Sequence, residues 1–130
     1  MSEDVDDQRC PCGRGPTYGR CCGRLHRGEV QALTAEDLMR SRYSAFAVGD
    51  AAYLERSWHP TTRPREMRLV PDQRWIGLDI VDTDAGGPLD ADGIVEFVAH
   101  FERGGRAGQL RERSTFTRVD GRWVYVSGQV

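Results

Sequence analysis

The sequence predicts an α+β protein in which a small cysteine-rich segment precedes helices that pack on a curved antiparallel sheet of four strands. Three observations support this fold class. All four cysteines lie between residues 10 and 22, apolar residues recur at helical spacing between residues 34 and 59, and alternating residues with short turns begin at residue 75. A length of 130 residues suits one compact domain with a small appendage.

The charge balance argues against a basic surface for nucleic acid or lipid. The chain has 18 basic and 20 acidic residues, a net charge of −2, and every basic residue is arginine. Its first seven residues lack the basic and apolar parts of a secretion signal, and no apolar run reaches the roughly 18 residues of a membrane span. We therefore expect a cytoplasmic protein with a flexible acidic tail over residues 1–8.

The four cysteines form two close pairs. They are Cys10, Cys12, Cys21 and Cys22. Disulfides are uncommon in a reducing cytosol, and one of the three pairings would join the last two, adjacent cysteines with strain. Zn²⁺ fits better, because a tetrahedral ion accepts four sulfur ligands in any sequence order. Residues 9–26 hold little apolar bulk besides Tyr18 and Leu25, so we expect metal binding to order this lobe.

Two alternatives remain open for the lobe. The thiols could be free or redox-active, or His26 could replace one cysteine as a metal ligand. Four sulfur ligands leave no open position on the ion, so a structural site is predicted rather than a catalytic one. Nearby arginines can offset the negative charge of such a site; they are Arg9, Arg14, Arg20 and Arg24.

The stretch CPCGRGPTYGRCCG resembles the SEC-C motif, the small zinc-binding module at the end of the SecA translocation ATPase. The shared pattern is C-x-C, eight residues and C-C, so the resemblance implies that the four cysteines bind zinc. The chain departs from the motif at Arg14 and Pro16, where serine and a basic residue are common. In SecA this module also contacts partners such as the chaperone SecB, which implies a protein partner for the lobe over residues 9–26.

Two helices are predicted after the lobe. Thr34 can cap the first helix, which carries an apolar stripe and ends at Gly49. Asp50 can cap the second helix, which we expect to end at His59 because a proline follows. Residues 60–72 are rich in proline and arginine and predict an irregular crossing.

Four strands with short connections predict an antiparallel meander. We expect them near residues 75–82, 93–102, 109–119 and 122–127. The Asp120-Gly121 dipeptide favours a two-residue hairpin with a type I′ turn. This turn sets the register of the last hairpin. The expected pairs are Val119 with Arg122, Phe116 with Tyr125 and Ser114 with Ser127.

The register assigns side chains to two faces of the sheet. Those expected to face the helices are Leu110, Glu112, Ser114, Phe116, Trp123 and Tyr125, with Val95, Phe97, Ala99 and Phe101 of the preceding strand. Val124 and Val126 would make the outer, solvated face partly apolar, which could serve a homodimer. On the same outer face, His100 with Glu96 and Glu102 could bind a stray metal ion, although a solvated strand is the default interpretation.

The order of elements, with the segments LMRSRYSAF, WHPTTRP, VEFVAHF and RERSTFTRVDGRWVYV, is similar to the YchJ-like family. The resemblance covers the chain from Cys10 to Gly128. Proteins of this family join an N-terminal SEC-C motif to a domain resembling nuclear transport factor 2, in which a cone-shaped sheet wraps against helices. The resemblance therefore implies a nuclear transport factor 2-like α+β domain over residues 32–130, with room for a ligand inside the cone.

A buried ion pair is the first candidate for the interior of the cone. Arg42 interrupts the apolar stripe of the first helix, and a buried guanidinium needs a carboxylate or several other acceptors. Glu112 lies on the inward face, so we predict an Arg42–Glu112 pair completed by Tyr43 or Ser114. This pair would either fix the helix on the sheet or form the polar floor of a ligand pocket.

The WHPTTR segment, residues 58–63, is the second candidate. Trp58 would form an apolar wall, His59 would act as a general base, and Arg63 would hold an anion. The resemblance to nuclear transport factor 2 implies this possibility, because domains of that architecture include dehydratases and isomerases that use a histidine or aspartate in the pocket as general base. In this sequence, however, no second residue clearly completes a catalytic dyad with His59. The favoured function is thus a zinc-containing module that binds a protein or small ligand. The alternative is a lyase-, isomerase- or hydrolase-type enzyme that uses the cone.

Overall fold

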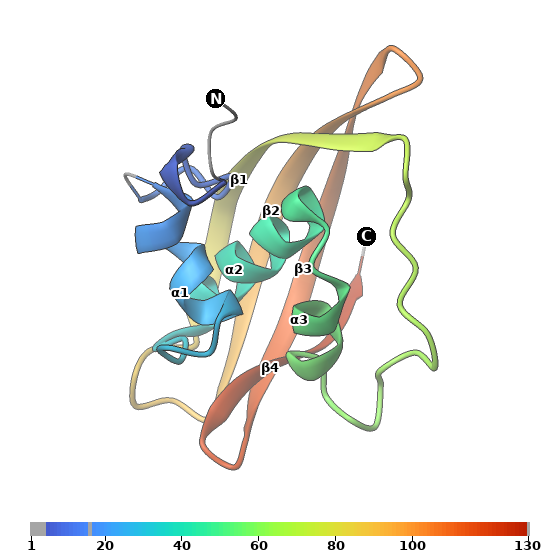
Figure 1. Ribbon diagram of the computed structural model, residues 1–130. Helices are drawn as coiled ribbons and strands as arrows, with labels where there is room; N and C mark the ends of the chain where they lie inside the picture. The colour runs from blue at the N-terminus through green and yellow to red at the C-terminus, as the bar shows by residue number, and fades with distance from the viewer. Residues whose placement is uncertain (1–4, 16, 130) are drawn as a thin grey trace.

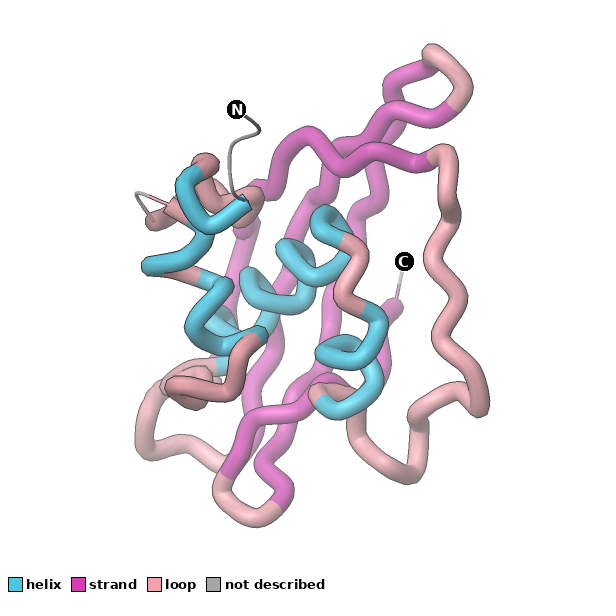
Figure 2. Tube along the Cα trace, in the orientation of Figure 1, coloured by secondary structure: helices cyan, strands magenta, loops and turns pink. Residues whose placement is uncertain are grey.

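The computed structural model describes residues 5–15 and 17–129, with helices on one face of a four-stranded sheet (Figure 1). This arrangement confirms the predicted α+β class. The elements in chain order are η1 (Val5–Asp7), η2 (Tyr18–Arg20), α1 (Cys22–His26), α2 (Ala35–Val48), α3 (Ala51–Arg56), β1 (Gln73–Ala85), β2 (Asp92–Arg103), β3 (Arg106–Val119) and β4 (Arg122–Gln129). Figure 2 shows the long loop between α3 and β1 running along one side of the molecule.

The expected acidic tail covers residues 1–8, of which 1–4 lie outside the described residues. Val5–Asp7 form the 3₁₀ turn η1, and Gln8 O accepts a hydrogen bond from Tyr18 N at 2.8 Å. Arg27 Nη1 also donates to Asp6 Oδ1 at 3.3 Å. The described part of the acidic segment is therefore attached to the cysteine lobe.

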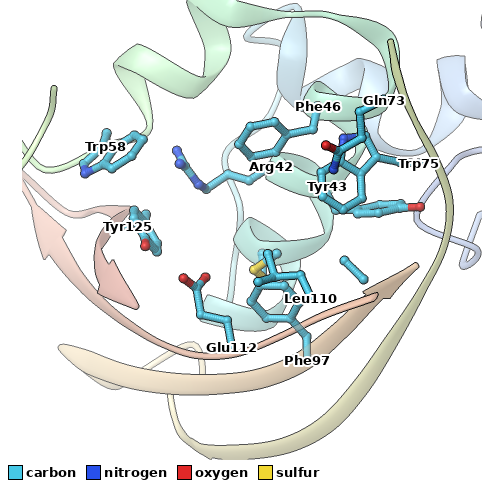
Figure 3. A pocket seen from close by; sticks show the side chains of 12 residues that line it. Arg42, Tyr43, Phe46, Trp58, Gln73, Trp75, Phe97, Leu110, Glu112 and Tyr125 are labelled. Carbon is cyan, nitrogen blue, oxygen red and sulfur yellow. The ribbon is translucent and has the colours of Figure 1, made fainter. Parts of the chain in front are cut away.

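Adjacent strands run antiparallel in the order β1-β2-β3-β4, so the sheet is the predicted meander. The Asp120-Gly121 turn has positive φ at both residues, 52° and 80°, as a type I′ turn requires. Two register shifts interrupt the pairing of β1 with β2, and a third interrupts that of β3 with β4. Such irregularities bend strands, and the sheet curves around α2 (Figure 3). The sheet does not close, because β1 and β4 do not pair with each other.

The register of the last hairpin follows the prediction only near the turn. The first two predicted pairs are confirmed, but the third is wrong, because Ser114 lies opposite Gly128 rather than Ser127. The register shift adds one residue to β4 between the turn and this pair. A turn dipeptide fixes the pairing only up to the first bulge.

The predicted caps of both main helices are present. Thr34 Oγ1 accepts a hydrogen bond from Asp37 N at 3.0 Å, and Asp50 Oδ1 accepts one from Tyr53 N at 3.1 Å. Helix α2 ends at Gly49, whose φ of 82° is the left-handed conformation that glycine tolerates. These local signals therefore set where α2 starts and stops.

Helix α3 ends at Arg56, earlier than the predicted end at His59, because the edge of the sheet competes for the backbone. Tyr125 N donates to Ser57 O at 2.8 Å, and His59 N donates to Tyr125 O at 2.7 Å. The segment after α3 thus lies along β4. Val124 of β4 is only 4% exposed, so the prediction that it contributes to an exposed outer face is wrong.

The main core lies between α2 and the inner face of the sheet. Alternate residues of β2 are buried there, as the period of two predicts. The cluster consists of Ala35, Leu38, Met39, Tyr43, Val95, Phe97, Ala99, Phe116 and Trp123. A separate small cluster in the lobe consists of Cys10, Cys12, Tyr18 and Cys22. The sheet domain therefore has an apolar core of its own.

The outer face of the sheet is largely ion-paired and solvated. Arg111 Nη2 lies 2.6 Å from Glu96 Oε2, in a pair between neighbouring strands. His100 Nε2 lies 2.8 Å from Asp79 Oδ2, so His100 pairs across the strands rather than forming a metal-binding group with Glu96 and Glu102.

Truncation of the core should cost much more stability than truncation of the outer face. Phe116 is fully buried, so Phe116→Ala should lower the free energy of unfolding by about 3–5 kcal/mol. Ile76 is 51% exposed, and the control Ile76→Ala should cost less than about 1 kcal/mol. Urea denaturation measures both values, and equal losses would contradict the position of Phe116 in the core.

Candidate functional site

The four cysteines converge in the N-terminal lobe. Their Sγ atoms all lie within 4.8 Å of one another. A turn closed by a hydrogen bond from Gly13 N to Cys10 O (3.0 Å) carries the first pair, and the second pair lies at the start of α1. Among residues 5–15 and 17–129, no other group of three or more cysteine, histidine or acidic side chains is arranged to hold a metal ion.

The spacing of the sulfur atoms fits a tetrahedral metal ion. With metal–sulfur distances of about 2.3 Å, as in zinc sites, neighbouring sulfurs lie about 3.8 Å apart. The Sγ atoms of Cys12 and Cys21 are 3.6 Å apart, far beyond the roughly 2.05 Å of a disulfide bond. Gly15 permits this packing, because a Cβ atom there would lie 2.7 Å from Cys21 Sγ. The four cysteines can therefore hold one metal ion.

The close packing of the thiols shifts the pKa values of Cys10 and Cys21 in opposite directions. Thiol hydrogen bonds from Cys12 and Cys22 hold the pKa of Cys10 well below its usual value. Burial raises the pKa of Cys21 to about 11. Several thiolates this close together repel one another, and a bound cation would stabilise them.

His26, the alternative ligand, does not belong to the cysteine cluster. Its Nε2–H donates to the backbone oxygen of Ser41 at 2.8 Å, and its Nδ1 accepts a hydrogen bond from the Tyr18 hydroxyl. Its ring centroid lies 4.5 Å from that of Tyr53. Both ring nitrogens are therefore engaged, and His26 joins the lobe to α2.

The burial of His26 predicts an acid-sensitive stability. Burial lowers the pKa of His26 below its usual 6.5, so the unfolded chain takes up this proton first. The contribution is present above about pH 6.5 and is lost as the pH falls. We expect the free energy of unfolding to fall more between pH 7.5 and 5.5 in the wild type than in His26→Gln. Parallel urea titrations test this, and an equal decrease in both proteins would contradict it.

The arginines of the lobe are less free than the sequence suggests. Arg14 forms ion pairs with Glu36 and Asp37 of α2, and Arg27 forms one with Glu29. These pairs neutralise part of the positive charge that the arginines bring to the lobe. Arg9, Arg20 and Arg24 form no ion pair within the described part of the chain.

A cavity of about 380 Å³ lies between α2 and the sheet (Figure 3). Its lining residues come from α2, from all four strands and from the segment after α3. They are Met39, Arg42, Tyr43, Phe46, Trp58, Gln73, Trp75, Phe97, Ala99, Leu110, Glu112 and Tyr125. The structure thus brings Arg42, Tyr43, Trp58 and Glu112 together, as the pocket hypothesis required.

Three residues proposed for the pocket do not line it. His59 Nδ1 accepts a hydrogen bond from Thr61 N at 3.1 Å, and Arg63 Nη1 donates to Glu55 O at 3.3 Å. Ser114 is fully buried beneath the pocket, where its hydroxyl donates to Glu112 Oε2 at 2.9 Å. The structure therefore gives no support to His59 as a general base for a reaction inside the cone.

Arg42 does not form the predicted ion pair with Glu112. Its Nη1 donates to Leu54 O at 2.9 Å and to Ser57 Oγ at 2.7 Å, at the C-terminal end of α3. The guanidinium carbon lies 5.0 Å from the ring centroid of Trp58 and 4.6 Å from that of Tyr125. These acceptors and rings hold the guanidinium in place of a carboxylate.

Burial lowers the pKa of Arg42 to about 10, so the group stays cationic at neutral pH. The carboxylate of Glu112 acts on it electrostatically across the pocket, although the two do not touch. Arg42 and Glu112 are therefore two opposite charges in one pocket that interact at a distance and do not form a salt bridge.

Most of the aromatic wall of this pocket is not evident from the sequence pattern. Phe46, Trp75 and Phe97 all line the cavity, although none of them is predicted as a pocket residue from the sequence. The alternating pattern of β2 does place Phe97 on the inner face of the sheet. The same pattern cannot show that the curvature of the strands keeps the sheet away from α2 and so leaves a cavity.

A curved antiparallel sheet around a central helix, preceded by a four-cysteine lobe, defines a nuclear transport factor 2-like domain with a SEC-C-type appendage. The family described as "YchJ, middle NTF2-like domain" matches residues 34–128. The chain belongs to this YchJ family. No helix in the described ranges is long and apolar enough to cross a membrane.

Relatives and solved structures agree with this assignment. A UPF0225 protein of Streptomyces coelicolor is 54% identical over 120 residues, which cover 92% of this chain and 94% of the relative. A UPF0225 protein of Ralstonia nicotianae is 47% identical over 133 residues, covering 93% and 90%.

Two solved SEC-C motif proteins share the fold. The solution structure of one from Rhodopseudomonas palustris has a TM-score of 0.83 and 34% identity, and the match covers 93% of this chain and 97% of that one. The crystal structure of another from Psychrobacter arcticus has a TM-score of 0.77 and 26% identity, covering 95% and 82%.

Proposed function

We propose that this chain is a binding protein with a structural zinc ion in its lobe and a small ligand in the pocket beneath α2. The observation that supports zinc most strongly is the convergence of four sulfur atoms within 4.8 Å. Sulfur would fill all four positions of a tetrahedral ion and leave none for water or substrate. The ion would therefore stabilise the lobe rather than take part in a reaction.

The composition of the lobe explains why it needs a metal ion. Among the described residues of the lobe, its buried apolar cluster holds Tyr18 and three cysteines. Four thiolates and one Zn²⁺ sum to a charge of −4 + 2 = −2, which nearby cations must offset. Arg40 Nη1 donates to Cys12 O at 2.9 Å, and Arg24 Nε donates to Cys21 O at 3.4 Å. Both guanidinium groups lie beside the proposed site.

Elemental analysis of reduced protein tests the zinc site. We expect about one zinc per chain in the wild type and less than about 0.2 in Cys22→Ser, because three thiolates hold the ion less tightly. Ser44→Ala is the matched control: Ser44 Oγ lies 3.5 Å from Cys10 Sγ but is not a proposed ligand, so its zinc content should stay near one. A wild type without stoichiometric zinc would overturn the proposal.

Metal removal should unfold the lobe and spare the sheet, because each has a separate buried cluster. After treatment with a chelator, residues 10–26 should lose protection from hydrogen exchange, while β2 and β3 keep theirs. The control is the same chelator saturated with zinc, which should change neither. Simultaneous loss of protection in the lobe and the sheet would contradict two separate units.

The pocket supports the second half of the proposal. A volume of about 380 Å³ lies in the range of small-molecule sites, which combine apolar walls with a few placed polar groups. Arg42 and Glu112 are the charged groups in this lining, and aromatic side chains make up much of the remainder. A small molecule with an apolar body and one polar end matches this lining.

A further inference from the structure

The two charges of the pocket lie at the same end of the cavity. In Figure 3, Arg42 extends from α2 and Glu112 from the sheet, and both charged ends lie near Trp58 and Tyr125. Trp75 lies toward the opposite end together with the carboxamide of Gln73, and Phe46 and Leu110 lie between the two ends (Figure 3). The cavity therefore has one charged end, while the rest of its lining is mostly apolar and includes the uncharged amide of Gln73.

The polar end has unused hydrogen-bonding capacity. The two Nη1 bonds of Arg42 leave its Nε and Nη2 donors without a partner in the described part of the protein. Glu112 accepts one hydrogen bond, from Ser114 to Oε2, and its Oε1 accepts none from the described residues. These atoms are open to the pocket, so a ligand that supplies both an acceptor and a donor can bond to them. Trp58 Nε1, in the same lining, is fully buried and has no hydrogen-bond partner among the described residues, so an acceptor on a ligand would also relieve the cost of that unpaired donor.

Gly128 helps to hold the Glu112 carboxylate in this position. A Cβ atom at residue 128 would lie 2.2 Å from Glu112 Cδ and 2.3 Å from Oε1. The carboxylate therefore packs directly against the backbone of β4 at residue 128, and a side chain there would displace it.

The opposite charges of Arg42 and Glu112 cancel, which selects the charge of the ligand. An anion that binds Arg42 would face the Glu112 carboxylate, and a cation that binds Glu112 would face the guanidinium. A zwitterion would match both charges but would have to lose the hydration of two charged groups within mostly apolar walls. An uncharged group with adjacent acceptor and donor avoids both costs.

We propose that the pocket binds an uncharged aromatic small molecule whose carboxamide- or lactam-type group accepts from Arg42 and donates to Glu112. This inference rests on the proposed function of the pocket as a ligand site and adds the chemical class of the ligand. The ring would lie among Phe46, Trp75 and Leu110, where its apolar surface is removed from water.

The test uses four soluble probes with the same ring: benzamide, benzoate, benzylamine and the zwitterion L-phenylalanine. The readout is the indole N–H signals of the three tryptophans in ¹⁵N-labelled holoprotein. Trp58 and Trp75 line the pocket, whereas Trp123 does not and donates its indole N–H to Leu33 O at 3.2 Å. Trp123 is therefore an internal control.

We expect benzamide to shift the Trp58 and Trp75 signals saturably, with a midpoint of about 1–10 mM, and to leave Trp123 unchanged. Benzoate, benzylamine and L-phenylalanine should bind at least about tenfold more weakly. Preferential binding of any charged probe would overturn the proposed ligand class but keep the pocket as a ligand site. Absence of saturable shifts with all four probes would overturn both.

Substitution of Glu112 tests the charge argument directly. Glu112→Gln keeps an acceptor oxygen and removes the negative charge, so benzoate affinity should rise at least about tenfold while benzamide binding changes less. Glu96→Gln makes the same chemical change on the outer face of the sheet and should leave both affinities unchanged. Unchanged benzoate affinity in Glu112→Gln would contradict the proposal. Arg42→Met should abolish benzamide binding, and the Glu112 variant keeps the test decisive if Arg42→Met fails to fold.

Discussion

Helix α2 is buried on several sides at once, and every functional part of the molecule is built against it. Eight of its fourteen residues are buried, including the polar residues Ser41, Arg42 and Ser44. A buried polar group needs a partner inside the protein, and the partners of these three lie in different structures. The Ser41 hydroxyl is hydrogen-bonded to the Tyr53 hydroxyl of α3, while the backbone oxygen of Ser41 accepts from His26. Ser44 Oγ contacts Cys10 Sγ, and Arg42 donates to the end of α3. The contacts of one helix thus fix the lobe, the short helix and the pocket relative to one another.

Local signals made much of this fold predictable. The caps Thr34 and Asp50, the Asp120-Gly121 turn and the cysteine spacing each act within a few residues, so the sequence contains all that they need. Features that depend on distant partners were not predictable. The bulge in β4 changed the partner of Ser114, and acceptors on α3 replaced Glu112 as partners of Arg42. The hydrophobic periodicity of the helix and the strand places Arg42 and Glu112 on surfaces that face each other. It does not predict the curvature of the sheet, which keeps the two side chains apart.

The lobe and the pocket are linked through the same helix without sharing a residue. Cys10 contacts α2 at Ser44, two positions after Arg42, which enters the pocket. A metal ion in the lobe would therefore stabilise contacts on one side of α2, and a ligand in the pocket would contact another side of the same helix. In this chain a four-cysteine lobe precedes the domain that matches the YchJ middle NTF2-like family over residues 34–128, and the shared helix gives a physical reason for keeping the two together.

Both edges of the sheet hinder the addition of a strand from another chain. At one edge, Trp58 bridges in parallel to Tyr125, so this segment already occupies hydrogen-bonding groups that a second chain would need. At the other edge, β1 breaks its pairing twice and exposes Asp79, Asp82 and Asp84. Bulges and charges hinder the addition of a foreign strand. Growth of the sheet into fibrous aggregates is therefore opposed at both ends, even where the protein is crowded.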